Sequence, residues 1–286
     1  MRKPLFRQSV PLSLWLLIGS GFALGTAATE ARGSDGNAEV PTSICRVLFS
    51  TQKNLSENRV RLTVAQCSGT LIGPRMVLTA GHCFDGGLPT GTQSTLKVQC
   101  SVQGLHPDGS YAFGFESKVA AVRIEGNFKD RGADFAFLRL YEAGPGQPMA
   151  LPLSAEAFES ELMVPSLTAP DNREIDPKVE CRFSGFSSKT TRGQGGFVTS
   201  DQSPRNGLRA YSNSQILAIE SFGEAVGKLN PGDSGGPLYC RKNPSSSWKL
   251  IAVLSGGNQK NAQTIWSVVP SSGFYSSFRQ LEKEWK

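Results

Sequence analysis

The sequence predicts an all-β fold followed by one helix, and three features of the chain support this prediction. Short runs of alternating apolar and polar residues recur, separated by Gly, Pro, Asn and Ser, as in strands joined by turns. The final segment has apolar side chains at helical spacing. Of the 286 residues, about 260 remain after an N-terminal leader, enough for one large or two smaller β domains.

The leader, residues 1–27, has the features of a secretory signal peptide. Arg2, Lys3 and Arg7 form a positive start, residues 12–23 are mostly apolar, and small residues around 25–28 offer a cleavage site. The apolar run is shorter than a membrane-spanning helix requires, although an uncleaved anchor is the alternative. We therefore expect a secreted or periplasmic protein with no stable membrane anchor after removal of the signal.

The chain beyond the leader carries a small net charge. The full sequence has a formal charge of +6, and removal of the three leader cations leaves +3. No long run of Lys or Arg is present, which argues against a nucleic-acid partner. Residues 28–44 are polar and rich in Gly, and we interpret them as a propeptide or a flexible arm.

The expected strands fall into two groups on either side of a turn-rich segment at 144–148. The first group lies at 46–50, 59–64, 70–72, 76–78, 96–101, 116–124 and 135–140. The second group lies at 179–183, 209–212, 215–220, 237–240, 248–254 and 265–269. Residues 184–213 are rich in Gly, Ser, Thr and Asn, and this composition predicts a mobile surface loop that could gate a site.

The C-terminal segment predicts an amphipathic helix. Phe274, Phe278, Leu281 and Trp285 fall at i, i+4, i+7 and i+11, which places them on one helical face. We expect this face to pack against the β structure.

Residues 232–237 (GDSGGP) carry the strongest chemical signal in the chain. A serine hydroxyl attacks a carbonyl well only when a base removes its proton and donors await the oxyanion. Glycines on both sides of Ser234 allow a reacting carbonyl to approach backbone N–H groups. Taken alone, the segment has a second explanation, a Gly-rich turn between strands.

Of the 2 histidines, one is well placed to act as the base. His82, within residues 78–83 (LTAGHC), follows an apolar run that predicts a rigid strand. His106 is flanked by turn residues, and we expect it in a surface loop.

An acid is needed to orient the imidazole and to stabilise its charged form. Asp134 opens the alternating segment 134–140, which predicts a strand, and an acid at such a position becomes buried only when it is paired. Asp130 competes for the role, and we favour Asp134 because of its position before the strand.

These segments, in the order His, Asp, Ser, resemble the trypsin-like (chymotrypsin-fold) serine protease family from about residue 40 to the C-terminus. The resemblance implies two six-stranded antiparallel β-barrels with the active site between them and a short C-terminal helix. The first barrel would span 45–146 and contain His82 and Asp134. The second would span 147–286 and contain Ser234 and the helix.

The resemblance implies a serine endopeptidase that works through an acyl-enzyme. The backbone N–H groups of Gly232 and Ser234 would bind the oxyanion. Protein or peptide substrates are the expected partners, with a protein inhibitor as a second class, and we expect no cofactor and no metal. The alternative is a catalytically silent binding or regulatory module on the same fold. An esterase is disfavoured because it would show a nucleophile elbow on an α/β pattern.

The 6 cysteines of an exported chain suggest three disulfides. The resemblance implies a Cys67–Cys83 bridge beside His82 and a Cys181–Cys240 bridge across the second barrel. Cys45 and Cys100 are left to pair by elimination, as a bridge without a counterpart in the family. No C-x-x-C spacing is present, which argues against zinc.

Two parts of the family pattern are changed. The usual Ile-Val-Gly-Gly start is missing, and a cut before Val40 would supply an apolar amine to pair with Asp233, although Pro41 follows at once. Cleavage at this point is therefore an open hypothesis.

The second change concerns the specificity pocket. Lys228 stands at its expected floor, with Ser255, Gly257 and Thr264 along its walls. Asn230 stands where the family has a cysteine. A floor lysine would favour Glu or Asp in the substrate, and the alternative is that Lys228 lies in solvent.

Overall fold

The structure is a computed structural model, and it describes most of the chain beyond the N-terminal segment. The described residues are 42–56, 59–85, 94–105, 111–126, 133–144, 148–151, 154–165, 173–176, 178–187, 196–200, 208–210, 216–220, 231–258, 263–269 and 272–285. Among the helices in those ranges, none has the length and apolar character needed to cross a membrane.

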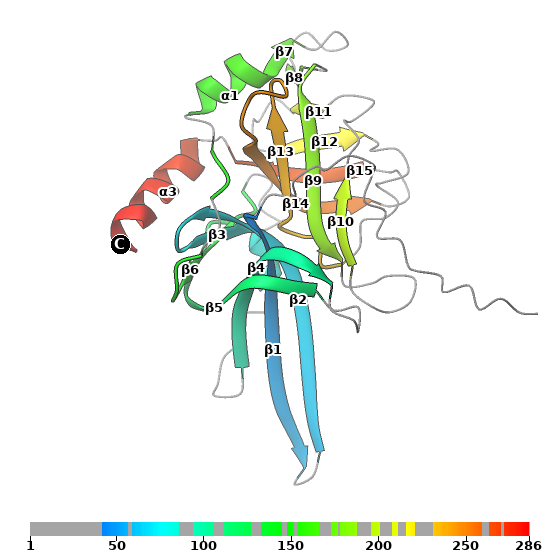
Figure 1. The fold of residues 1–286 in the computed structure, drawn as a ribbon, viewed down its shortest axis with the longest axis vertical. Coiled ribbons are helices and arrows are strands. Elements are labelled where there is room, and N and C mark those ends of the chain that lie inside the picture. Colours follow the sequence, from blue (N-terminus) through cyan, green and yellow to red (C-terminus); the bar gives the residue numbers. More distant parts are fainter. Residues whose placement is uncertain are drawn as a thin grey trace, which may run out of the picture. The chain divides into compact units, whose positions relative to one another are not determined.

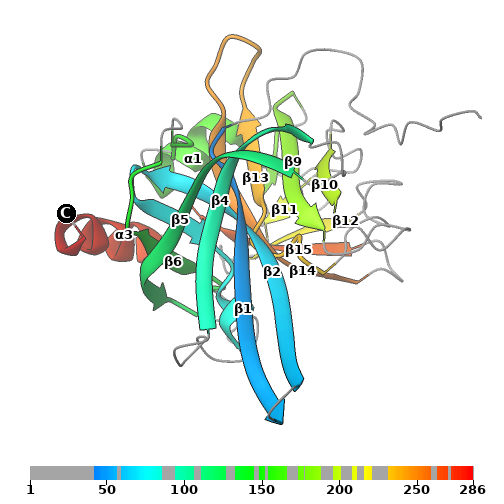
Figure 2. The same ribbon diagram turned by 60° about the horizontal axis from the view of Figure 1, so that its bottom comes forward.

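Six antiparallel strands form a closed barrel, as predicted for the first half. They are β1 (Ile44–Ser56), β2 (Arg59–Gly73), β3 (Met76–Thr79), β4 (Ser94–Leu105), β5 (Tyr111–Ile124) and β6 (Ala136–Leu140). Their order around the barrel is β1-β2-β3-β6-β5-β4, and β4 pairs with β1 to close it. Figure 2 shows β2, β1, β4 and β5 running side by side.

The strands β1 and β2 are longer than the sequence pattern predicts. They pair with each other out to Ser56 and Arg59, whereas β1 pairs with β4 only as far as Thr51. Beyond Thr51 they continue as a two-stranded ribbon, visible in Figure 1 below the rest of the barrel. Residues 59–63 of this ribbon lie within the strand predicted at 59–64, whereas no strand was predicted beyond residue 50 of β1; pairing with β2 extends β1.

The barrel interior contains the apolar residues that alternate along these strands. The buried members include Val47, Leu71, Val77, Val98 and Leu138. All four residues of β3 are buried, and this explains why the short run before His82 forms a rigid strand.

The second half is also mainly β structure, but its described strands form a nine-stranded sheet. The elements are α1 (Ala155–Leu162), β7 (Met163–Pro165), β8 (Arg173–Ile175), β9 (Glu180–Ser187), β10 (Gly196–Ser200), β11 (Leu208–Ala210), β12 (Ile216–Glu220), β13 (Pro237–Arg241), β14 (Lys249–Asn258) and β15 (Gln263–Val268). Their order is β10-β9-β13-β14-β15-β12-β11-β8-β7. The expected second closed barrel of six strands therefore stays a prediction.

The prediction that residues 184–213 form one loop is wrong in part. Strand β9 continues to Ser187, and β10 and β11 both lie inside this range. Strand β10 pairs with β9, and β11 pairs with β8 and β12. Pairing with neighbouring strands thus outweighs the turn-like composition of the segment.

Helix α1 was not predicted from the sequence. Ser154 caps it by accepting a hydrogen bond from the Ala157 N–H at 3.1 Å, and Glu156 lies in the first turn. A serine followed closely by an acid is a recognised start signal for a helix.

The predicted C-terminal helix is present as α3 (Ser272–Glu284). Phe274 and Leu281 are buried, and Phe278 is partly buried against the same core. The Phe274 ring lies 5.6 Å from that of Phe135 and 5.4 Å from that of Phe137, between ring centres. The apolar face of α3 therefore packs on β6 and the residue before it, as expected.

The structure contains the three expected disulfides, Cys45–Cys100, Cys67–Cys83 and Cys181–Cys240. Cys45 and Cys100 are directly opposite each other on β1 and β4, and Cys181 and Cys240 are opposite on β9 and β13. These two bridges join neighbouring strands, whereas Cys67–Cys83 joins β2 to the short helix η1 (Gly81–Phe84).

Around the predicted crossing at 144–148, the chain passes from the barrel to the second sheet. The Met149 N–H donates to the Leu71 carbonyl of β2 at 2.9 Å. The next residue, Ala150, accepts a hydrogen bond from the Leu250 N–H of β14 at 2.8 Å.

Candidate active site

The pairing of β3 with β6 brings His82 and Asp134 to the same end of two neighbouring strands. Thr79, the last residue of β3, is opposite Ala136, the first residue of β6. His82 follows Thr79 within η1, and Asp134 precedes Ala136, so both side chains lie just beyond the paired ends. Local strand pairing thus brings together two residues that are 52 positions apart.

The Asp134 carboxylate contacts His82 at two points. Its Oδ2 lies 2.7 Å from His82 Nδ1, and its Oδ1 accepts the His82 backbone N–H at 2.8 Å. Asp134 is only 2% exposed, so these charge-assisted bonds form away from water. A buried carboxylate requires such partners, and this one fixes both the ring and the backbone of His82.

A third donor reaches Asp134 from the second half of the molecule. The Ser255 hydroxyl, on β14, donates to Asp134 Oδ2, and Ser255 is buried. Ser255 was predicted to lie in a pocket wall; its hydroxyl bonds to the acid, and the wall position stays a prediction. Ser255 therefore connects the His82–Asp134 pair to the second sheet.

Gly81 allows this close packing around His82. A Cβ atom at Gly81 would lie 1.8 Å from the Gly126 carbonyl oxygen and 3.1 Å from Asp134 Oδ1. No side chain fits there, which is the physical reason for a glycine directly before the histidine.

Ser234 lies in a tight turn that precedes β13. Gly232 and Gly235 have φ of +106° and +81°, a backbone conformation that glycine adopts without strain. Backbone bonds hold the turn: Gly236 N–H to the Asp233 carbonyl at 2.9 Å, and Gly235 N–H to the Leu254 carbonyl at 2.7 Å.

This turn also lies against the first barrel. The Ser68 N–H of β2 donates to the Ser234 carbonyl at 2.7 Å. A Cβ at Gly235 would lie 2.2 Å from Thr79 Oγ1, 2.3 Å from the Ser68 carbonyl oxygen and 2.8 Å from the Ala80 nitrogen. The turn that carries Ser234 thus contacts the chain two residues before His82.

The predicted oxyanion donors, the N–H groups of Gly232 and Ser234, both belong to this turn. Within the described part of the chain, the N–H groups of Gly232 and Ser234 donate to no protein acceptor. The Gly232 and Asp233 residues are buried, and Ser234 is half-buried. An oxyanion requires donors that are not already bonded, and the role of these two N–H groups stays a prediction.

The predicted pocket is described in part. Gly257 and Thr264 are directly opposite each other on β14 and β15, two residues beyond Ser255 along β14. The floor residue Lys228 lies outside the described residues, as do Asn230, Asp130, His106 and Val40.

Sequence reasoning missed Ser68 and Leu254, both of which hold the Ser234 turn through bonds to its backbone. Ser68 also donates from its hydroxyl to the Gly232 carbonyl at 2.9 Å. Neither residue carries a signal in the sequence, because serine and leucine are common within strands, and the partner of Ser68 is 164 positions away.

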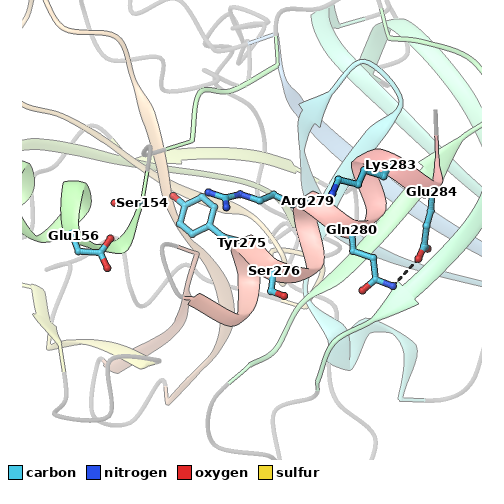
Figure 3. A pocket seen from close by; sticks show the side chains of 8 residues that line it. All are labelled: Ser154, Glu156, Tyr275, Ser276, Arg279, Gln280, Lys283 and Glu284. Atoms are coloured by element: carbon cyan, nitrogen blue, oxygen red, sulfur yellow. Dashed lines mark hydrogen bonds between the residues drawn. The ribbon is translucent and has the colours of Figure 1, made fainter.

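A separate cavity of about 670 Å³ lies between the start of α1 and the outer face of α3 (Figure 3). Glu156, Tyr275, Arg279 and Lys283 are among the residues that line it. Burial raises the pKa of Tyr275 from its ordinary value of 10.0 to about 12. None of the predicted catalytic residues lines this cavity, so it is distinct from the candidate active site.

Solved structures similar to this one include two chains of low sequence identity. The structure of Vibrio cholerae VesB protease matches with a TM-score of 0.49 and 15% identity, over 85% of this chain and 64% of that one. A structure titled GrC matches with a TM-score of 0.49 and 20% identity, over 83% of this chain and 93% of that one.

Three curated proteins are similar in sequence. Serine protease SepA autotransporter of Shigella flexneri is 23% identical, over 86% of this chain and 19% of that protein. Transmembrane protease serine 9 of Rattus norvegicus is 26% identical, over 73% of this chain and 18% of that protein. A trypsin-like protease of Streptomyces glaucescens is 27% identical, over 67% of this chain and 65% of that protein. The chain thus spans less than two thirds of the length of each of these relatives.

The family model described as Trypsin matches residues 48–276, which include His82, Asp134 and Ser234. This match covers most of the chain and includes all but the first few residues of the barrel. The chain therefore belongs to the Trypsin family.

Proposed function

We propose that this chain is a secreted serine endopeptidase that hydrolyses peptide bonds through an acyl-enzyme. His82 is the general base, Asp134 orients it, and Ser234 is the nucleophile. The observation that carries the proposal is the two-point contact between Asp134 and His82 beside the turn that holds Ser234.

In the first step, the Ser234 oxygen attacks the peptide carbonyl carbon while His82 takes the hydroxyl proton. The N–H groups of Gly232 and Ser234 donate to the oxygen that becomes negative, and each such donor is worth about 3–4 kcal/mol of barrier height. His82 then gives its proton to the leaving amine as the C–N bond breaks. This leaves an ester between Ser234 and the acyl half of the substrate.

In the second step, water replaces the amine. His82 takes a proton from the water molecule as the water oxygen attacks the ester carbon. The Ser234–acyl bond then breaks, and His82 returns a proton to the Ser234 oxygen. Asp134 stabilises the imidazolium formed in each step, since its carboxylate is buried and already bonded to Nδ1.

We propose the following division of the chain into segments. Residues 1–27 are the signal peptide, 28–44 a propeptide or arm, 45–146 the first barrel, and 147–286 a second barrel with α3. The contact of Ser255 with Asp134 supports a site formed where the two halves meet.

For specificity, we propose that Lys228 at the pocket floor favours substrates with Glu or Asp before the cleaved bond. The opposed Gly257 and Thr264 on β14 and β15 supply neighbouring wall positions for such a pocket. Profiling with a peptide library tests this directly, and cleavage after Arg or Lys would overturn it.

The central experiment is labelling of the mature protein with a fluorophosphonate probe, with Ser234→Ala as the control. We expect labelling of the wild type and none of the variant, together with hydrolysis of a protein substrate by the wild type alone. Absence of labelling in wild-type protein that has lost its signal and propeptide would favour the binding module.

Activation by cleavage before Val40 is a separate proposal, in which the new amine pairs with Asp233. N-terminal sequencing of the active protein tests it. A first residue far from Val40 would exclude this route and leave the catalytic proposal intact.

A further inference from the structure

Ser68 is a fully buried serine of β2 whose polar groups all contact the elements that form the active site. Its N–H donates to the Ser234 carbonyl at 2.7 Å, and its carbonyl accepts the Thr79 hydroxyl at 2.6 Å. Its hydroxyl donates to the Gly232 carbonyl at 2.9 Å and accepts the Phe186 N–H of β9 at 2.7 Å. Ser68 therefore joins the barrel, the nucleophile turn and the second sheet.

The turn needs such a restraint at Gly232. Glycine has no Cβ to limit rotation of its neighbouring peptide planes, and Gly232 adopts φ of +106°. The Ser68 hydroxyl holds the Gly232 carbonyl toward the barrel, and the Ser68 N–H holds the Ser234 carbonyl toward the same side. With both carbonyls turned to the barrel, neither can point its negative end at the place where an oxyanion forms.

We infer that the Ser68 hydroxyl is a positioning group. It fixes the Gly232–Asp233 peptide, which links the two peptides that carry the Gly232 and Ser234 N–H groups, and thereby keeps those two donors aimed at the reacting carbonyl. The catalytic consequence rests on the proposed function. Ser68 does not touch the substrate and acts through Gly232.

The neighbouring residue on the same face of β2 provides a matched control. Gln66 donates from Nε2 to the Phe186 carbonyl at 3.0 Å, while Ser68 accepts the Phe186 N–H. The two side chains therefore hold the same backbone residue of β9, but only Ser68 reaches Gly232. A purely structural role in holding β9 would be shared by both residues, whereas positioning of the turn belongs to Ser68.

The test compares Ser68→Ala, Ser68→Thr and Gln66→Ala with the wild type in fluorophosphonate labelling rate, in kcat and KM, and in crystal structures. We expect Ser68→Ala to reduce the labelling rate and kcat by about 10–100-fold, since the donors lose their orientation and are not removed. KM should not change, because the lost contribution acts in the transition state. Gln66→Ala should label at the wild-type rate, and Ser68→Thr, which keeps the hydroxyl, should restore labelling.

Crystal structures of the variants test the positioning role of Ser68 independently of activity. We expect the Gly232–Asp233 peptide to turn away from residue 68 in Ser68→Ala and to stay in place in Gln66→Ala. An unmoved peptide in Ser68→Ala, or an equal loss of rate in Gln66→Ala, would overturn the inference. If the wild type does not label but the peptide turns in Ser68→Ala, the proposed function fails and the positioning role of Ser68 stands. Should Ser68→Thr not fold, Ser68→Ala and Gln66→Ala still give both comparisons.

Discussion

The two sides of the candidate active site are held in place by different kinds of contact. On the His82 side, the carboxylate of Asp134 bonds to a ring nitrogen, a backbone N–H and the Ser255 hydroxyl. On the Ser234 side, backbone bonds hold the turn: the Ser68 N–H donates to the Ser234 carbonyl, and the Gly235 N–H donates to the Leu254 carbonyl. The Ser68 hydroxyl adds a further bond to the turn.

This difference shows how the two sides depend on their surroundings. The His82 side depends on a single charged group whose loss removes several strong bonds at once. The Ser234 side depends on close packing and on backbone geometry. Adding even one side-chain carbon to a glycine of the turn should therefore reduce activity as much as removing a functional group does. Four predictions test this comparison.

The largest effect is expected from Asp134→Asn. The amide removes the charge that stabilises the imidazolium and favours the wrong tautomer of His82, so kcat should fall by about 10⁴-fold. Asp85→Asn is the control, because Asp85 is exposed directly after η1. Steady-state kinetics on both variants measure the effect, and a fall of less than tenfold for Asp134→Asn would mean that another acid, such as Asp130, has the role.

The next effect is expected from Gly235→Ala. The new Cβ would lie 2.2 Å from Thr79 Oγ1 and 2.3 Å from the Ser68 carbonyl, at a φ of +81°. We expect a loss of about 2–5 kcal/mol in the free energy of unfolding and of about 100-fold in kcat/KM. Denaturant unfolding and kinetics measure both quantities.

Gly273→Ala is the matched control for this change. Gly273 lies in α3 with nothing within 4 Å of the added Cβ. The substitution should leave kcat/KM unchanged and raise stability by at most about 1 kcal/mol. If Gly235→Ala were equally harmless, the turn would not be held by close packing against β2 and β3.

Removal of individual disulfides should separate stability from catalysis. The Cys45–Cys100 and Cys67–Cys83 bridges have sequence separations of 55 and 16, so their loss should cost about 4 and about 3 kcal/mol in the chain-entropy model. Only the second bridge adjoins His82 and Ser68, so only Cys67→Ser/Cys83→Ser should also reduce kcat. Equal kcat values for the two double variants at a temperature where both are folded would contradict this prediction.

The smallest effect is expected at Glu180 of β9, away from the site. Its carboxylate accepts hydrogen bonds from Arg182 at 2.8 Å and from Arg241 at 2.7 Å, and both guanidinium groups lie over the Trp248 ring. Burial alone would raise the pKa of Glu180, but the bonds from Arg241 and Arg182 together hold it below its usual value of 4.5.

A pKa that is lower in the folded state stabilises the fold above the unfolded value, and this stabilisation is lost as the pH falls through the folded pKa. Glu180→Gln should therefore lower stability by less than about 1 kcal/mol at pH 7, and the difference should disappear at acidic pH. Thermal unfolding of both proteins between neutral and acidic pH measures this. A difference that persists at acidic pH would show that the ion pair is not its source.

Much of the fold and of the candidate site could be predicted from local patterns. The first-barrel strands, the α3 face and the segments with His82, Asp134 and Ser234 were found from alternation, helical spacing and residue chemistry. The outer part of β1 and the strand β10 were not predicted, because each is sustained by backbone pairing with the neighbouring strand of its hairpin and not by an apolar pattern of its own. Strand β11 overlaps the strand predicted at 209–212.

By itself, the sequence determined which reactive groups the chain carries and the order in which they occur. A histidine after an apolar run, an acid before a strand and a serine in a Gly-rich turn have few common roles together, so the sequence alone indicates their chemistry. Only the tertiary structure decided which ordinary residues hold them: Ser255 on Asp134, and Ser68 on a carbonyl 164 positions away. The physical reason is that a serine hydroxyl can bond to many groups, and its choice depends on neighbours that the fold alone brings within hydrogen-bonding distance.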